Sequence, residues 1–250
     1  MIQAINEMLI KNGFVLSFLV VGVIMLITDF ISNKILKNKI PGVALAIALG
    51  LVLASFGGKT GIADIPLFSG MALLGGSMLR DFAIVATAYG ASMQEIIKAG
   101  WVGVISLFVG VFFNFIVGSI VAYAFGYRDA GDIATLASGT CTFIVGPITG
   151  NAVGASSEII TLSIAAGVIK VLIVAVVTPL IKNVVGIKTK TSAMVFGGVM
   201  GTVSGVSAAL ASINTKLVPY GALTATFYTG IAAILCPSVF YPILQWLLNQ

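Results

Sequence analysis

Two long, strongly apolar stretches without a charged residue restrict most strongly what the chain can fold into. They cover residues 101–125 and 217–250. Each is longer than the roughly 20 apolar residues that a helix needs to cross a bilayer. Charged residues make up 8% of the chain, whereas soluble domains usually contain about 25%. The sequence therefore predicts an all-α integral membrane protein, a polytopic bundle in contact with the lipid bilayer.

Two lysine-rich loops, 32–40 and 182–190, are expected in the cytoplasm because short cytoplasmic loops are enriched in basic residues. An even number of crossings must then separate these loops. The apolar segments between them number five: 43–56, 67–89, 101–125, 134–157 and 159–181. One of the five therefore fails to cross the membrane. We expect 134–157 to be a re-entrant hairpin, with 43–56 as the alternative.

The segment 138–158, SGTCTFIVGPITGNAVGASSE, is apolar but is interrupted by glycines and a proline. Pro147 has no amide hydrogen and would clash inside a helix, so we expect a break near Gly146 and Pro147. A broken backbone is stable in hydrocarbon only where it packs against protein or lines a cavity. Many secondary transporters form substrate and ion sites from such discontinuous helices. We therefore predict a membrane carrier with its binding site in this segment.

A second segment, 192–212, is rich in glycine, serine and threonine. Freed backbone amides at the start of a half-helix can bind an anion. The alternative is close helix packing, since Gly197, Gly201 and Gly205 are spaced by four. We expect the substrate to bind where the two segments approach each other. The predicted contacts are Thr142, Thr149, Asn151, Thr202 and Ser204.

Three charged residues lie inside apolar segments, where a charge costs about 2.5–3.5 kcal/mol at the bilayer centre. Arg80 either binds a carboxylate of the substrate or snorkels with Asp81 to a membrane surface, and both readings stay open. Lys170 lies near the centre of 159–181 and should face protein or water. Its possible partners are Glu158 and Asp81. Glu158 could instead stabilise the start of its own helix.

The residue inventory argues against enzymatic chemistry and against a bound cofactor. The chain contains no histidine, and its two cysteines, Cys141 and Cys236, both lie inside apolar segments. Buried thiols of this kind usually serve as packing residues. The net charge of +5 comes mainly from lysines in short loops, which fits the positive-inside bias. It therefore does not indicate a nucleic-acid partner.

Three long strings carry a resemblance: IADIPLFSGMALLGGSMLRDFAIVATAYG (62–90), FIVGPITGNAVGASSEIITLSIAAGVIK (143–170) and KLVPYGALTATFYTG (216–230). They resemble the larger, MadM-type subunit of the malonate:sodium symporter, and the likeness extends over nearly the whole chain from Phe14. This resemblance implies a multi-pass carrier of the bacterial cytoplasmic (inner) membrane that imports malonate with sodium. It also implies a smaller membrane partner, the MadL-type subunit. A higher oligomer stays open.

A fainter similarity, to LrgB-type membrane proteins, covers residues 138–250. It leaves an alternative: a membrane export-control or scaffold protein, or a carrier of another small organic acid.

Malonate is a dianion, and helix ends contribute at most about 2 kcal/mol each to its binding, so a basic side chain, a bound cation or both are needed. The resemblance indicates sodium as this cation. Its predicted ligands are Asn151, Thr149 and carbonyls around Gly146. We expect a single transmembrane transporter domain over residues 1–250, with possible repeat halves 14–125 and 134–250.

Overall fold

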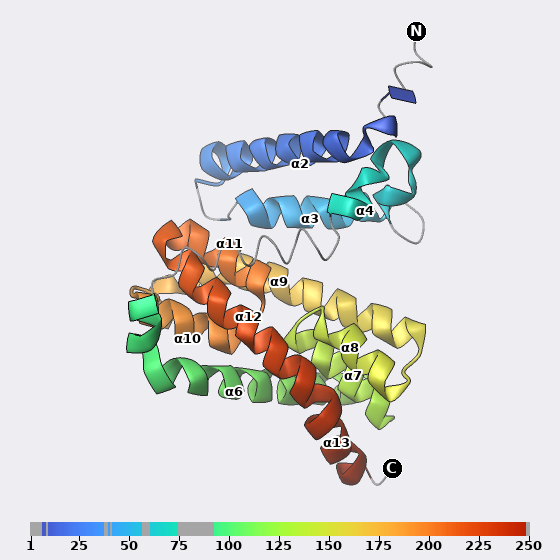
Figure 1. Ribbon diagram of the computed structural model, residues 1–250, viewed down its shortest axis with the longest axis vertical. Coiled ribbons are helices and arrows are strands. Elements are labelled where there is room, and N and C mark those ends of the chain that lie inside the picture. The colour runs from blue at the N-terminus through green and yellow to red at the C-terminus, as the bar shows by residue number, and fades with distance from the viewer. Residues whose placement is uncertain are drawn as a thin grey trace. The chain divides into compact units, whose positions relative to one another are not determined.

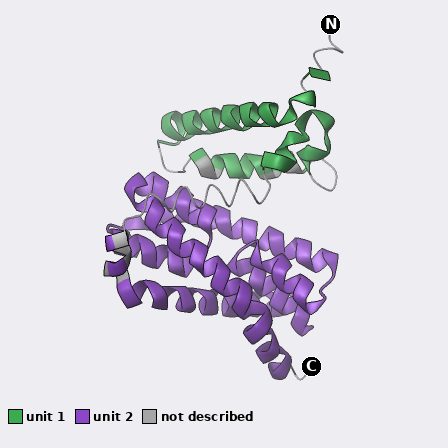
Figure 2. Ribbon diagram, viewed as in Figure 1, with its two compact units in different colours: residues 1–86 green, residues 87–250 purple. Residues whose placement is uncertain are grey.

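The computed structural model describes residues 7–8, 10–37, 40, 42–56, 61–74 and 93–248. The chain divides into two compact units, residues 1–86 and residues 87–250 (Figure 2). The regular elements of the described residues are α-, 3-10 and π-helices (Figure 1), which confirms the all-α prediction. The predicted single domain and repeat halves stay predictions.

The first unit is built around helix α2 (Gly13–Phe30), which continues into the π-helical turn Ile31–Ile35. The chain then returns as α3 (Gly42–Ala54), and Asp29 of α2 lies directly against Gly42. Two 3-10 turns, Ile62–Asp64 and Pro66–Phe68, lead into α4. This short helix, Gly70–Leu74, packs its first residue against the backbone of Gly13.

The second unit contains three long apolar helices. Helix α6 (Met93–Ala124) is kinked at Gly100, where φ is 47°. Helix α9 spans Ser157–Val185. Helix α12 (Val218–Leu235) follows the 3-10 turn Thr215–Leu217. It continues through the π-helical turn Cys236–Phe240 into α13 (Tyr241–Leu247).

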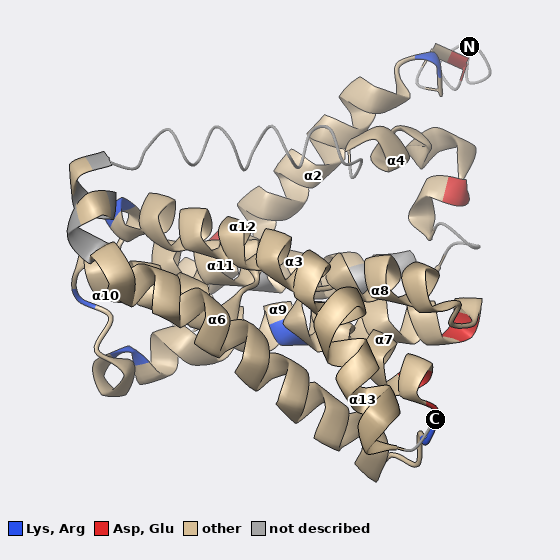
Figure 3. Cartoon of the chain, turned by 60° about the horizontal axis from the view of Figure 1, so that its bottom comes forward, with Lys and Arg blue, Asp and Glu red and all other residues tan. Residues whose placement is uncertain are grey.

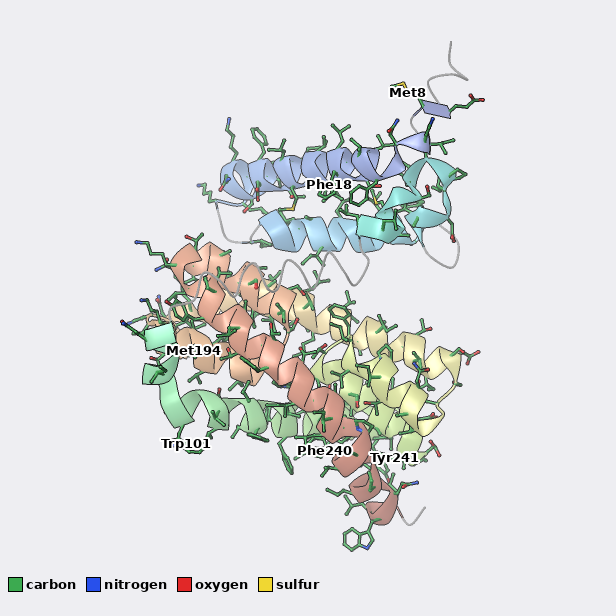
Figure 4. All side chains as sticks on the ribbon, viewed as in Figure 1. Met8, Phe18, Trp101, Met194, Phe240 and Tyr241 are labelled. Carbon is green, nitrogen blue, oxygen red and sulfur yellow. The ribbon has the colours of Figure 1, made fainter. Side chains whose placement is uncertain are left out.

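Four helices among the described residues are long and apolar enough to cross a membrane, which supports a multi-pass protein. They are Gly13–Ile35, Gly100–Ala124, Ser157–Val185 and Thr215–Leu247. Helix α6 exposes large apolar side chains, among them Trp101, which projects from the helix with 79% of its surface exposed (Figure 4).

Two short helices form the first hairpin, α7 (Ala130–Cys141) and α8 (Val145–Val153), joined by residues 142–144. A β-carbon placed on Gly146 would lie 3.0 Å from the Cα of Gly139, and one on Gly150 would lie 2.9 Å from Thr135. Residues later in α8 thus contact residues earlier in α7, so the two helices run antiparallel. A helical hairpin is therefore present at the predicted segment, and its re-entry into the membrane stays a prediction.

The break in this hairpin lies four residues before its predicted position. Thr142 is extended, with φ of −157° and ψ of 150°, whereas Gly146 and Pro147 lie in the first turn of α8. Proline is tolerated there because the amide it lacks has no intrahelical acceptor in the first turn. The proline thus marks the start of α8 and not the break itself.

A second hairpin, which the sequence did not predict, is formed by α10 (Lys190–Met200) and α11 (Val203–Ile213). Its tip is Gly201, in the left-handed conformation with φ of 72°, and Thr202. Both helices of this hairpin pack along α12. Lys190 near the start of α10 and Leu210 near the end of α11 contact Tyr220 and Gly221. The tip contacts Tyr228, two turns further along α12.

The two hairpins extend from opposite ends of α9 and meet beside its middle (Figure 1). Gly150 of the first hairpin contacts Ile160, and the tip residue Phe143 contacts Gly167. Gly205, just past the second tip, lies against Val171. The first hairpin therefore lies along the N-terminal half of α9, and the second continues from the point where the first ends.

Charge separates the two ends of this unit (Figure 3). Acidic residues lie where the first hairpin opens, at Asp129, Asp132 and Glu158, with Arg128 among them. Basic residues lie where the second hairpin opens, at Lys182, Lys188, Lys190 and Lys216. The positive-inside rule therefore predicts that the second hairpin opens toward the cytoplasm and the first toward the opposite side.

Glycine contacts in the first hairpin give a direct stability test. A β-carbon on Gly139 would collide with the carbonyl oxygen of Ser163, whereas one on Gly230 would meet nothing within 4 Å. Overpacking of this kind typically costs about 1–3 kcal/mol. We expect Gly139→Ala to lower the thermal unfolding temperature in detergent and Gly230→Ala to leave it unchanged or raise it. Equal unfolding temperatures for the two variants would contradict the hairpin packing.

Candidate functional site

Lys170, in the middle of α9, lies between the two hairpin tips. Its Nζ donates a hydrogen bond of 3.1 Å to the carbonyl oxygen of Cys141, the last residue of α7. The same nitrogen lies 5.7 Å from the ring centroid of Tyr228. A β-carbon on Gly201 would collide with that ring. The Lys170 ammonium group is therefore hydrogen-bonded to the first tip. The Tyr228 ring lies between this ammonium group and the second tip.

The local electrostatics favour an additional anionic group beside Lys170. The C-terminal end of α7 carries a partial negative charge, which stabilises the ammonium group. The face of the Tyr228 ring adds a cation–π contact. The ammonium group has three donors, and the described residues accept one hydrogen bond from it. The side chain is only partly buried, so a small ligand could use the remaining donors.

Of the two partners suggested for Lys170 by the sequence, Glu158 is excluded and Asp81 stays a prediction. Glu158 lies in the first turn of the same helix, 12 positions away, which is about 18 Å along the axis. An ion pair over this distance is excluded. Glu158 instead occupies a helix start whose cap, Ser156, accepts a hydrogen bond from the amide of Ile159 at 3.3 Å. Asp81 lies outside the described residues.

Thr142 organises the first tip. Its hydroxyl oxygen accepts a hydrogen bond from the Ile144 amide at 3.1 Å, and its carbonyl oxygen accepts one from the Val145 amide at 3.0 Å. The residue is buried. Thr142 thus already stabilises the turn that lies against Lys170.

Thr149, about one turn into α8, has a hydroxyl without a hydrogen-bond partner, unlike Thr142. The side chain is fully buried, and its oxygen has no hydrogen-bond partner among the described residues. A threonine in a helix commonly donates to the carbonyl four residues earlier. An orphan buried hydroxyl is costly, so this position favours a bound ligand or ion.

The second tip presents the start of a helix that lacks a side-chain cap. Thr202 occupies the cap position of α11, yet its hydroxyl accepts no bond from the helix amides and has no partner in the described part of the chain. It is 2% exposed. The first intrahelical bond in α11 is that of Val206 to the Thr202 carbonyl. The amides of residues 203–205 precede this bond, as at any helix start.

This helix start lies next to the lysine and is suited to an anion. Gly205 packs on Val171, the neighbour of Lys170 in α9. Helix starts attract negative charge through their amides and the helix dipole. The buried and unpartnered hydroxyl of Thr202 adds one more hydrogen-bonding group. Lys170 and the start of α11 are therefore both groups that attract an anion.

The predicted site residues fall into three groups. Thr142, Thr149 and Thr202 are buried in the two hairpins, with Thr142 and Thr202 at the tips. Asn151 and Ser204 are exposed, on the outer faces of α8 and α11, so the structure does not bring them into the buried cluster. Arg80 lies outside the described residues. The roles of all six residues stay predictions.

The predicted sodium ligands divide in the same way. Gly146 and Thr149 are buried in the first hairpin, whereas Asn151 is exposed. No group of three or more acidic, cysteine or histidine side chains gathers among the described residues. A sodium ion would therefore be held by hydroxyl and carbonyl oxygens, which half-helix ends provide in other carriers. The orphan hydroxyl of Thr149 fits this kind of site.

Comparison with known protein families gave one match. A family model described as the malonate/sodium symporter MadM subunit matches residues 5–248, nearly the full chain, and it confirms the resemblance found in the sequence. No curated protein and no solved structure matches the chain.

The contact between Gly201 and Tyr228 can be tested with a matched glycine. Gly201 and Gly186 both end a helix in the left-handed conformation, with φ of 72° and 73°. Alanine therefore costs a similar backbone strain, about 1–2 kcal/mol, at either position. Only at Gly201 does the new β-carbon also meet Tyr228, since the space beside Gly186 is open.

We expect Gly201→Ala to displace Tyr228 and expose Cys141, a fully buried neighbour of that ring in the core. In a Cys236→Ala background, alkylation of Cys141 by a maleimide should be faster in Gly201→Ala than in Gly186→Ala. Equal alkylation rates would show that the second tip does not rest on Tyr228.

Proposed function

Because the chain belongs to the MadM family of malonate/sodium symporter subunits, we propose that it carries malonate across the bacterial cytoplasmic membrane with sodium as the coupling ion. The observation that carries this proposal is the position of Lys170 between the tips of two opposed helical hairpins. Such half-helix ends at the middle of a membrane domain are typical substrate sites of secondary transporters.

Malonate has two carboxylates joined by one methylene group. We propose that one carboxylate binds the ammonium group of Lys170 and the other binds the amides at the start of α11 together with the Thr202 hydroxyl. The start of α11 packs through Gly205 on Val171, the residue that follows Lys170 in α9. A small dicarboxylate could therefore use both at once.

A charge count supports the coupling to a cation. Malonate brings two negative charges and Lys170 supplies one positive charge. The start of α11 contributes about half a positive charge, and the end of α7 beside Lys170 about half a negative charge. The remaining negative charge would be costly to bury. One sodium ion bound with malonate brings the site close to neutrality. We place this ion at the first hairpin, with the Thr149 hydroxyl and the Gly146 carbonyl as ligands and Asn151 at the outer edge.

Two residues of the original site prediction have peripheral roles in this proposal. Ser204 is exposed on the first turn of α11, where its amide belongs to the helix start that would hold a carboxylate. Arg80 stays the alternative partner for that carboxylate. The variant Arg80→Gln distinguishes a site at Arg80 from a site at the start of α11.

The proposal includes a smaller membrane partner of the MadL type, which the family resemblance supports. The early spans offer a suitable apolar face. Helix α2 exposes large side chains along its length, including Val15, Leu19 and Leu26. We expect the partner to cover this face and leave the two hairpins to the substrate. A higher oligomer of the pair is compatible with this arrangement.

Uptake of labelled malonate into proteoliposomes, with and without sodium and the small subunit, tests the proposed function. Loss of a hydrogen bond to a charged ligand typically costs about 1.5–3 kcal/mol, which is roughly ten- to a hundredfold in affinity. We expect a loss of this size in Lys170→Met and in Thr202→Val. Lys182→Met is the matched control, because Lys182 is an exposed lysine of the same helix.

Two results would contradict the proposal at different levels. Normal uptake by Lys170→Met and Thr202→Val, combined with loss of malonate binding in Arg80→Gln, would move the site to the earlier segment. Absence of malonate-dependent stabilisation or uptake in the native pair of subunits would favour an export-control protein or a carrier of another organic acid.

A further inference from the structure

One face of α6 receives both hairpins. Gly110, Asn114 and Gly118 are spaced by four and so lie on the same side of the helix. A β-carbon on Gly110 would lie 2.7 Å from the Cα of Val199 in α10. One on Gly118 would lie 2.9 Å from the Cα of Ala137 in α7. The two glycines thus admit the backbones of the two hairpins, and Asn114 lies between them.

Asn114 is hydrogen-bonded to both hairpins. Its side-chain amide donates to the carbonyl oxygen of Val199 at 2.8 Å, and also to Gly110 in its own helix at 2.7 Å. Its backbone carbonyl accepts a hydrogen bond of 3.1 Å from the hydroxyl of Thr140. Val199 lies two residues before the tip at Gly201, and Thr140 lies two residues before the tip at Thr142.

The bond to Val199 has a specific consequence for the second tip. The last four carbonyls of a helix have no partner within it, and Val199 is the next-to-last residue of α10. Asn114 satisfies this carbonyl from a neighbouring helix. A leucine here would fill a similar volume but leave the carbonyl without this bond. The side chain therefore fixes the end of α10 against α6 as well as filling space.

We propose that Asn114 is a positioning residue that sets the spacing of the two hairpin tips around Lys170, and that this spacing selects a three-carbon dicarboxylate. The inference rests on the proposed function. In the proposed function, one carboxylate binds Lys170 at the first tip and the other binds the start of α11 at the second tip. The distance between the tips then decides which length of dicarboxylate can bind both groups at once. Loosening the second tip then weakens malonate binding and reduces discrimination against a diacid that is one methylene longer.

The geometric half of this inference is tested without any substrate. Spin labels at Ile148 of α8 and Ala211 of α11, both exposed, report the distance between the hairpins in a background lacking Cys141 and Cys236. We expect Asn114→Leu to shift or broaden the distance distribution in the purified pair of subunits. The control is Thr229→Val, which loses a hydroxyl bond of 3.0 Å to Ala225 within α12.

The functional half uses malonate uptake with succinate as competitor. In Asn114→Leu we expect the half-saturating malonate concentration to rise about three- to tenfold, the effect of one neutral hydrogen bond. The preference for malonate over succinate should fall by a similar factor. Thr229→Val should change neither quantity. If Asn114→Leu does not fold, Asn114→Gln displaces the donor by one methylene group and should produce the same changes.

Each outcome has a defined meaning. An unchanged distance distribution in both Asn114 variants would overturn the inference. A changed distribution with unchanged malonate affinity and unchanged selectivity would overturn its link to the substrate. Failure of the native pair to bind malonate would instead refute the proposed function, and the distance measurement would still decide whether Asn114 positions the tips.

Discussion

The ammonium group of Lys170 is the constraint on which the second unit depends. A charged side chain in the middle of an apolar span costs about 2.5–3.5 kcal/mol even when it can adjust its surroundings. The structure offsets this cost with a helix end and an aromatic face, at Cys141 and Tyr228. A helix end at this depth requires a broken helix. The first hairpin therefore supplies the helix end that stabilises this partly buried charge, and the second packs on the Tyr228 ring beside it.

Close backbone packing makes these broken helices stable in a membrane. Water is absent there, so every freed amide and carbonyl needs a protein partner or a ligand. Glycines at Gly139, Gly167 and Gly198 lie so close to neighbouring helices that a β-carbon would not fit. The side-chain amide of Asn114 donates a hydrogen bond to the Val199 carbonyl at the end of α10. Three buried side-chain hydroxyls of the described residues lack a partner, those of Ser119 in α6, Thr149 and Thr202. The last two lie in the hairpins where malonate and sodium are proposed to bind.

Sequence reasoning predicted the first hairpin because Pro147 and the parity of the crossings exclude a continuous span. It missed the second because Gly201 belongs to a spacing of four that fits helix packing equally well. It suggested Glu158 as a partner of Lys170 because a sequence shows side-chain charges, whereas the partner among the described residues is a backbone carbonyl. The role of Asn114 could not be predicted either. A single neutral polar residue in an apolar span does not reveal its hydrogen-bond partners, which only the tertiary structure shows.

The distance between the Lys170 nitrogen and malonate tests the central claim most directly. Solid-state NMR can measure it in lipid bilayers, with nitrogen-labelled lysine side chains, carbon-labelled malonate carboxylates and sodium present. A charge-assisted hydrogen bond has a nitrogen–oxygen distance of about 2.7–2.9 Å, so we predict strong nitrogen–carbon coupling that disappears in Lys170→Met. Absence of coupling in the native protein, or its persistence in Lys170→Met, would contradict a substrate site between the hairpin tips.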